Sequence, residues 1–148
     1  MTTLSTDHRS ATGPAAGIAL RVLAAAALGV SAYVHIHLAA HPFNAAPGTI
    51  TQARLFYAQG VVAAIVALAL LAVGNRYVWW AAALVGAGSF AAVMLYTYVN
   101  IGKLGPMPNM NDPGWLPSPE KALSAVAEAT VVVLWLIHEL TRRRSVRA

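Results

Sequence analysis

The sequence predicts an all-α fold, a transmembrane four-helix bundle with its N- and C-termini both in the cytoplasm. Apolar residues make up 58% of the 148 residues and charged residues 10%, against about 45–50% and ~25% in soluble domains. The apolar residues form four stretches, each close to the ~20 residues that cross a bilayer. Charged residues lie almost wholly between and outside these stretches, whereas the helices of a soluble protein carry charges on one face.

The elements follow one another in a simple order. Residues 1–15 are polar and predict a flexible cytoplasmic tail, and a transmembrane domain follows at 16–141. Its spans are predicted at about 18–40, 55–73, 77–99 and 119–140, and a basic cytoplasmic tail at 142–148. Ser118 and Pro119 favour a helix start, because serine is a good N-cap and proline fits the first helical position.

The distribution of arginine and lysine predicts the orientation. Seven of these residues lie on the side that holds both termini and the 74–76 turn, and three lie on the other: Arg54, Lys103 and Lys121. The positive-inside rule therefore places both termini in the cytoplasm. We expect a multi-pass protein of the cytoplasmic membrane. The alternative is a cleaved signal peptide, with Arg9 and Arg21 before an apolar core at 22–34.

Polar residues inside the spans gather in the half that faces away from the cytoplasm. Because such residues are costly in lipid, they usually have a partner or a task. The candidate ligand-binding residues of this polar layer are His35, His37, Gln59, Tyr96 and Glu128. Glu128 is the deepest, and a carboxyl group at that depth is either neutral or paired, with His35 and Gln59 as candidate partners. The alternative is that these residues only join the helices by hydrogen bonds.

The histidines also suggest a metal site. His35 and His37 are two residues apart and point about 200° away from each other on a helix. His37 and His41 are four apart and share one face, so they are the better pair for copper or zinc. Met107 and Met110 would suit copper(I) through their thioethers. Copper is therefore a candidate cofactor, although no thiolate or clear third protein ligand completes the set.

Residues 102–118 form the longest connection, and their proline and glycine residues disfavour a helix. Loops of this length are often lids or binding loops, so we expect a semi-rigid cap over the polar layer. A plain connector between distant helix ends is the alternative. Asp112 is the only acid at its centre and has no evident partner.

The sequence contains no cysteine, which excludes disulfides and thiolate metal sites. No phosphate-binding loop, serine nucleophile elbow or nucleic-acid module is present. The basic residues cluster in the tails, so the lipid bilayer and not nucleic acid is the expected partner.

Three short motifs give a resemblance to a known group: His-x-His-Leu at 35–38, Leu-Phe-x-x-Gln at 55–59 and Trp-x-Pro-x-Pro-Glu at 115–120, ahead of Glu128. Together they resemble small four-span integral membrane proteins of actinobacteria, including mycobacteria. The resemblance implies the location and the architecture, and it implies no activity or substrate.

Three function classes follow. The first is a structural or interaction component of an envelope complex, as a homo-oligomer or with another membrane protein. The second is a binder or carrier of a small ligand or metal, which would use the polar layer. The third is a membrane enzyme with Glu128 as acid or base, which is disfavoured because no nucleophile or cofactor motif accompanies it.

Overall fold

The computed structural model describes residues 14–41, 50–115 and 119–147 and contains four helices. They are α1 (Pro14–Ala39), α2 (Gln52–Ala72), α3 (Arg76–Tyr98) and α4 (Pro119–Arg147). No strand occurs in these ranges, so the predicted all-α class is confirmed. Each helix is long and apolar enough to cross a membrane. The chain is a small multi-pass integral membrane protein.

Helices α1, α2 and α4 are somewhat longer than the predicted spans, and α3 has the predicted length but lies one residue earlier. Helix α1 begins at Pro14, and α4 continues to Arg147, so most of the basic segment after residue 141 is a helical extension of α4. Helix α4 begins at Pro119, as the sequence predicts. Most of the predicted N-terminal tail and the predicted N-cap Ser118 lie outside the described residues.

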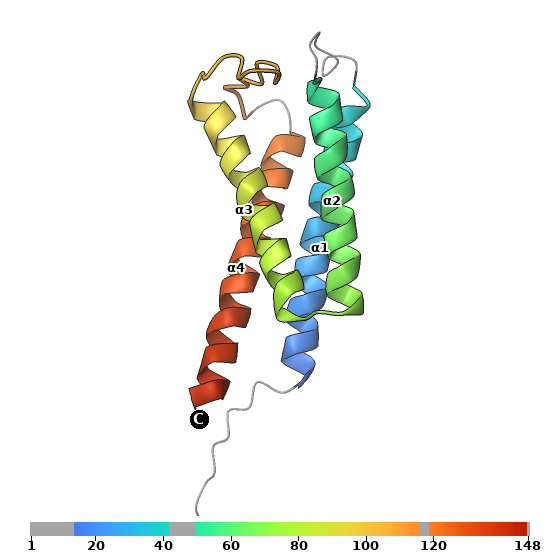
Figure 1. Cartoon of the computed structure of the whole chain (residues 1–148), viewed down its shortest axis with the longest axis vertical. Coiled ribbons are helices and arrows are strands. Elements are labelled where there is room, and N and C mark those ends of the chain that lie inside the picture. The colour runs from blue at the N-terminus through green and yellow to red at the C-terminus, as the bar shows by residue number, and fades with distance from the viewer. Residues whose placement is uncertain (1–13, 42–49, 116–118, 148) are drawn as a thin grey trace, which may run out of the picture.

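The helices form one bundle, shown in Figure 1. The start of α1, the end of α4 and the α2–α3 turn lie at one end, here called the terminal end. The segment 99–115 lies at the other, the loop end. Helix α1 packs against α2 and α4, and α3 packs against α4. Helices α2 and α3 contact each other less, and Figure 1 shows them diverging toward the loop end.

The tight α2–α3 turn is held by side chains at the terminal end. Gly74 has a φ of 58°, a conformation that glycine adopts without strain. Asn75 caps α3 by accepting hydrogen bonds from the amides of Tyr77 and Val78. Arg21 of α1 donates to the carbonyl oxygens of Leu70 (3.0 Å) and Leu71 (2.6 Å). It thereby satisfies carbonyls that the end of α2 leaves without a partner in its own helix.

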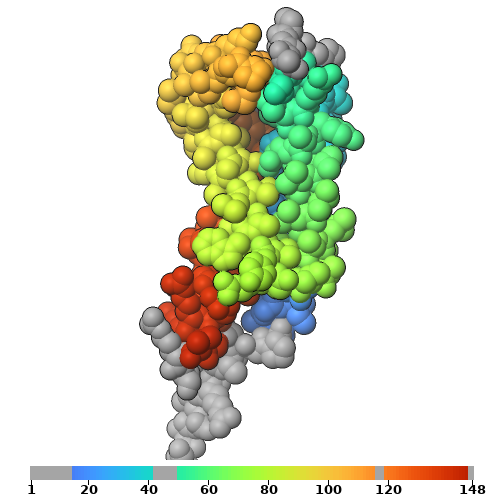
Figure 2. Space-filling model, viewed as in Figure 1, coloured from blue at the N-terminus to red at the C-terminus, as the bar shows by residue number. Residues whose placement is uncertain are grey.

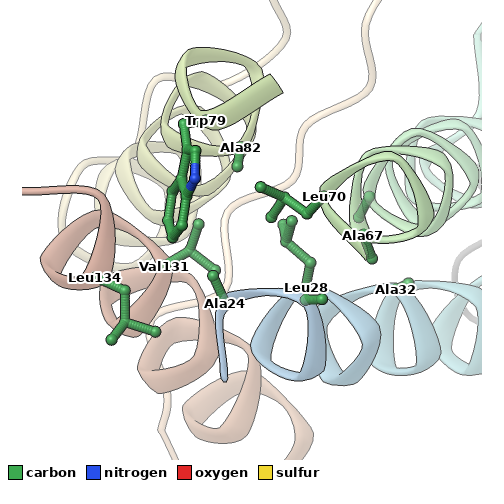
Figure 3. Packing of buried hydrophobic residues seen from close by; sticks show 11 residues of the cluster. Ala24, Leu28, Ala32, Ala67, Leu70, Trp79, Ala82, Val131 and Leu134 are labelled. Atoms are coloured by element: carbon green, nitrogen blue, oxygen red, sulfur yellow. The ribbon is translucent and has the colours of Figure 1, made fainter. Parts of the chain in front are cut away.

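The buried apolar core joins all four helices (Figure 3). Trp79 is 1% exposed and lies against Val131, while Leu28 and Leu70 fill the space between α1 and α2. Much of the remaining core is alanine: Ala24, Ala32, Ala67 and Ala82. Small residues let helix backbones approach closely in lipid, where packing is a main source of association.

Two glycines lie at close helix contacts. A Cβ at Gly60 would lie 2.6 Å from Ile36 Cγ1, and one at Gly86 would lie 3.0 Å from the carbonyl oxygen of Glu128. A larger side chain at either position would therefore push against the neighbouring helix. A Cβ at Gly29 or Gly88 would meet open space. Pairs of small residues four apart, such as Ala25 with Gly29 and Gly60 with Ala64, therefore mark close helix contacts at only some of their positions.

The outer surface of the bundle is apolar. Large aliphatic side chains are exposed on every helix, among them Leu23, Ile65, Leu84 and Val133, each more than half exposed. In water such a surface would favour aggregation. In a bilayer it is the expected surface, because lipid chains solvate apolar side chains.

Candidate ligand-binding cleft

A cleft of about 930 Å³ opens between α2 and α3 in the half of the bundle nearest the loop end. Figure 2 shows it as a hollow between the green surface of α2 and the yellow outer half of α3. Residues of α1 and α4 lie at its back, and residues 104–112 of the loop close it at the end. Its volume is within the range of about 300–1,000 Å³ that is common for small-molecule sites.

The hollow results from small side chains on α3. Gly88, Ala91 and Ala92 face it, and Gly88 has open space where a Cβ would be. Leu55 and Phe56 of α2 form the opposite wall. Because α2 and α3 diverge here, these small residues leave a space that the wall opposite does not fill.

The loop over the cleft is fixed by specific contacts. The amide of Asp112 donates to the carbonyl oxygen of Tyr96 (3.0 Å), which ties the loop to α3. Lys121 of α4 lies 3.2 Å from the Asp112 carboxylate and donates to the carbonyl oxygens of Asp112 and Gly114. Trp115 donates from Nε1 to the hydroxyl of Tyr98 (3.1 Å). The predicted semi-rigid cap fits these contacts, whereas the expectation that Asp112 lacks a partner is wrong.

A polar cluster lies behind the cleft. Glu128 is 1% exposed, and its Oε1 accepts hydrogen bonds from Ser31 (3.0 Å) and Ser124 (2.8 Å). Ser89 of α3 also interacts with this carboxyl group. Three helices thus meet at one side chain. Among the described residues, no donor lies within hydrogen-bond distance of Oε2.

His35 connects this cluster to the cleft. Its Nδ1 lies 2.9 Å from the carbonyl oxygen of Ser31, so Nδ1 carries the hydrogen. Its Nε2 lies 3.8 Å from Glu128 Oε1, which is too long for a hydrogen bond. The edge-to-face contact with Phe56, with ring centroids 5.6 Å apart, fixes the imidazole against α2. His35 is 7% exposed and lines the cleft.

Gln59 of α2 also lines the cleft, and its Nε2 is buried. Within the described part of the chain this Nε2 has no hydrogen-bond partner. An unpaired buried donor costs free energy, so such groups usually mark a missing water, ion or ligand. Gln59 and His35 both line the cleft.

Three of the five candidate binding residues line the cleft: His35, Gln59 and Tyr96. Glu128 lies behind them and does not line it. His37 points away from the bundle, is exposed, and stacks on Tyr33 with ring centroids 5.8 Å apart. His35 and His37 therefore point in different directions, as the sequence predicts.

The candidate copper ligands lie in two different places. His37 and His41 are neighbours, with ring centroids 4.8 Å apart and His41 Nδ1 2.9 Å from the His37 carbonyl oxygen. Met107 and Met110 line the cleft, which His37 and His41 do not. The described residues contain no group of three or more histidine or acidic side chains placed to hold a metal.

Some features of the site did not emerge from the sequence. Ser31 is four residues before His35, and Ser124 is four before Glu128, so each pair shares a helix face. That spacing is a detectable signal, but the contact of both hydroxyl groups with Glu128 depends on how the helices pack. The hollow at Gly88 has no sequence signal of its own, because Gly86 shares its residue type and is tightly packed.

The fold and the cleft together define a small integral membrane protein with a cleft between two of its helices. Comparisons with protein-family models, curated proteins and solved structures find no match.

Proposed function

We propose that the protein binds a small lipid-soluble molecule in the cleft between α2 and α3. The observation that carries this proposal is the cleft itself, whose walls are largely apolar and which the polar residues His35 and Gln59 also line. Sites for small molecules combine largely apolar walls with a few placed polar groups. A bundle that served only as a packing surface would have no need of such a space.

The position of the cleft supports entry from the membrane. It opens between two helices whose outer surfaces are apolar, so a lipid-soluble molecule reaches it without crossing water. With both termini in the cytoplasm, as the arginine and lysine distribution predicts, the cleft lies in the outer leaflet of the cytoplasmic membrane. The predicted role in an envelope complex stays a prediction, and the binding role does not exclude it.

Photolabelling tests the binding role. The purified protein in detergent is illuminated with a diazirine derivative of octanol, and the labelled residues are mapped by peptide mass spectrometry. We expect label on cleft residues such as Leu55 and Tyr96, and we expect excess unlabelled octanol to suppress it.

Two matched variants separate the cleft from the outer surface. Gly88→Leu fills the cleft, whereas Gly29→Leu adds the same side chain on the outer face of α1, where a Cβ also meets open space. Both variants gain helix propensity, so neither should unfold. We expect cleft labelling to fall at least five-fold in Gly88→Leu and to persist in Gly29→Leu. Equal labelling of the two variants would contradict the proposal.

A further inference from the structure

We infer that a groove between α1 and α2, at the loop end of the bundle, binds an anionic phospholipid of the surrounding leaflet, with the lipid phosphate at Arg54. This site is separate from the cleft between α2 and α3 and is independent of the proposed binding function. Three features of the groove support it: a channel of small side chains, a cation without a partner, and the depth at which each lies.

The groove lies where α1 ends and α2 begins, and it has a volume of about 500 Å³. Four of its lining residues are alanine: Ala39, Ala40, Ala53 and Ala58. Ile36 also lines it and packs against Gly60, where the absence of a side chain lets the two helices lie close together. The two helices thus form an apolar channel with a shallow floor, into which a lipid chain fits.

Arg54 is the only charged residue among the described residues that line the groove. Its side chain is exposed, and within the described part of the chain its guanidinium group makes no hydrogen bond or ion pair. The sequence has no acidic residue between Asp7 and Asp112, and Asp112 pairs with Lys121. A guanidinium group binds phosphate through two parallel hydrogen bonds. Arg54 is therefore available to an anionic group from outside the chain.

The charged end of the groove lies at the depth of lipid headgroups. Helix α2 has 21 residues, so its length of about 31 Å matches the ~30 Å of hydrocarbon in a bilayer. Arg54 is its third residue, about 3 Å along the axis from its start. Tyr57 follows one turn deeper and is 59% exposed, as is common for tyrosine at a membrane interface. Ala58 and Ile36 lie further from the loop end, so a lipid with its phosphate at Arg54 places its chain against them.

The charge of Arg54 favours one class of phospholipid. An anionic phospholipid neutralises the guanidinium group, whereas a zwitterionic one brings an ammonium or choline group that competes for its own phosphate. One basic side chain near a membrane surface strengthens binding of an anionic headgroup about five-fold. The groove therefore favours phosphatidylglycerol over phosphatidylcholine.

Native mass spectrometry of the purified protein in detergent tests this preference. The probes are phosphatidylglycerol and phosphatidylcholine with the same oleoyl chains, and glycerol phosphate, which has a phosphate group and no chains. We expect phosphatidylglycerol to bind about five-fold more tightly than phosphatidylcholine. Glycerol phosphate should not bind at the same concentrations, because the channel holds the lipid chain.

A pair of charge variants identifies the cation. Arg54→Gln removes the guanidinium group, and Lys103→Gln is the control, because Lys103 is exposed at the loop end and lies outside the groove. We expect the ratio of the two lipid affinities to fall to about one in Arg54→Gln and to stay at about five in Lys103→Gln. Both side chains are exposed, so the unfolding midpoints should stay equal to that of the wild type.

A second pair of variants tests the channel. Ala58→Leu fills the groove, whereas Ala26→Leu adds the same side chain at an exposed position of α1 outside it. We expect Ala58→Leu to weaken phosphatidylglycerol binding at least three-fold and Ala26→Leu to leave it unchanged. Gly88→Leu, which fills the cleft between α2 and α3, should also leave it unchanged.

The opposite results are distinct. Equal affinity for the two lipids in the wild type, or a preference that survives Arg54→Gln, would overturn the inference. Loss of the preference in Lys103→Gln would show a general effect of surface charge, and binding of glycerol phosphate as tight as that of the lipid would show an anion site without a lipid channel. Each would also overturn it. Weaker binding in Gly88→Leu but not in Ala58→Leu would assign the lipid to the cleft instead.

Discussion

At the scale of single residues, Glu128 determines how three helices meet. Its Oε1 is shared by hydroxyl groups of Ser31 on α1 and Ser124 on α4, and Ser89 approaches it from α3. The contact needs an oxygen acceptor at this point. A negative charge is not required for it, because an amide oxygen accepts hydrogen bonds from hydroxyl groups as well.

Two substitutions of Glu128 separate these properties. Glu128→Gln keeps the acceptor, and we expect its free energy of unfolding to stay within about 1 kcal/mol of that of the wild type. Glu128→Leu leaves two buried hydroxyl groups without their acceptor, which should cost about 1–3 kcal/mol. Reversible unfolding in mixed micelles measures both. A collapse of Glu128→Gln with a stable Glu128→Leu would show that the acceptor is unimportant.

At this scale the sequence predicts which polar residues form much of the site, but it does not predict their hydrogen-bond partners. Burial cost alone singles out His35, Gln59 and Glu128, since polar side chains in apolar spans are rare. Their partners depend on helix rotation, which the low amphipathicity of these spans leaves open. The sequence predicts His35 or Gln59 as the partner of Glu128, whereas in the structure the hydroxyl groups of Ser31 and Ser124 lie closer to its carboxyl group than His35 does.

At the scale of helices, the glycine residues of α3 show where this helix packs closely against α4. Gly86→Ala brings a methyl group to 3.0 Å from the Glu128 carbonyl oxygen and 3.2 Å from Val131 Cβ. We expect it to lower the free energy of unfolding by about 1–3 kcal/mol, the usual cost of overpacking. Gly88→Ala, two positions further along α3, meets open space and should raise stability by up to about 1 kcal/mol. A change in the free energy of unfolding in the same direction for both variants would contradict this packing of α3.

The contact between Arg21 and the end of α2 is a second test at this scale. Arg21→Ala leaves the carbonyl oxygens of Leu70 and Leu71 without their donor. We expect a loss of about 1–3 kcal/mol in unfolding experiments. Arg76→Ala is the control, because Arg76 is exposed at the same end of the bundle and lies over the Tyr77 ring. Equal effects of the two substitutions would argue against a specific role for Arg21.

The existence of the helices follows from the sequence, and their packing does not. Stretches of about 20 apolar residues predict the four spans, and Pro119 marks a helix start that the structure confirms. Four alanine-rich helices offer many small faces, so sequence spacing cannot choose between Gly60 and Gly29 as a contact. The space between α2 and α3 depends on that choice.

At the scale of the whole molecule, the orientation in the membrane is open to direct test. The chain has no cysteine. A single introduced cysteine is therefore the only thiol that a maleimide can label, and its labelling shows on which side of the membrane it lies. We expect Lys103→Cys to react with a membrane-impermeant maleimide on intact cells, and Ser145→Cys to react only after the membrane is permeabilised. The reverse pattern would place the cleft in the inner leaflet.

Ligand-dependent unfolding tests whether the cleft between α2 and α3 is a binding site. A ligand that binds only the folded state stabilises it by about 2.7 kcal/mol at 100 times its dissociation constant. Titration with decanol at constant detergent should raise the unfolding midpoint of the wild type and of Gly29→Leu, and leave that of Gly88→Leu unchanged. The same rise in all three proteins, or no rise in the wild type, would contradict the account.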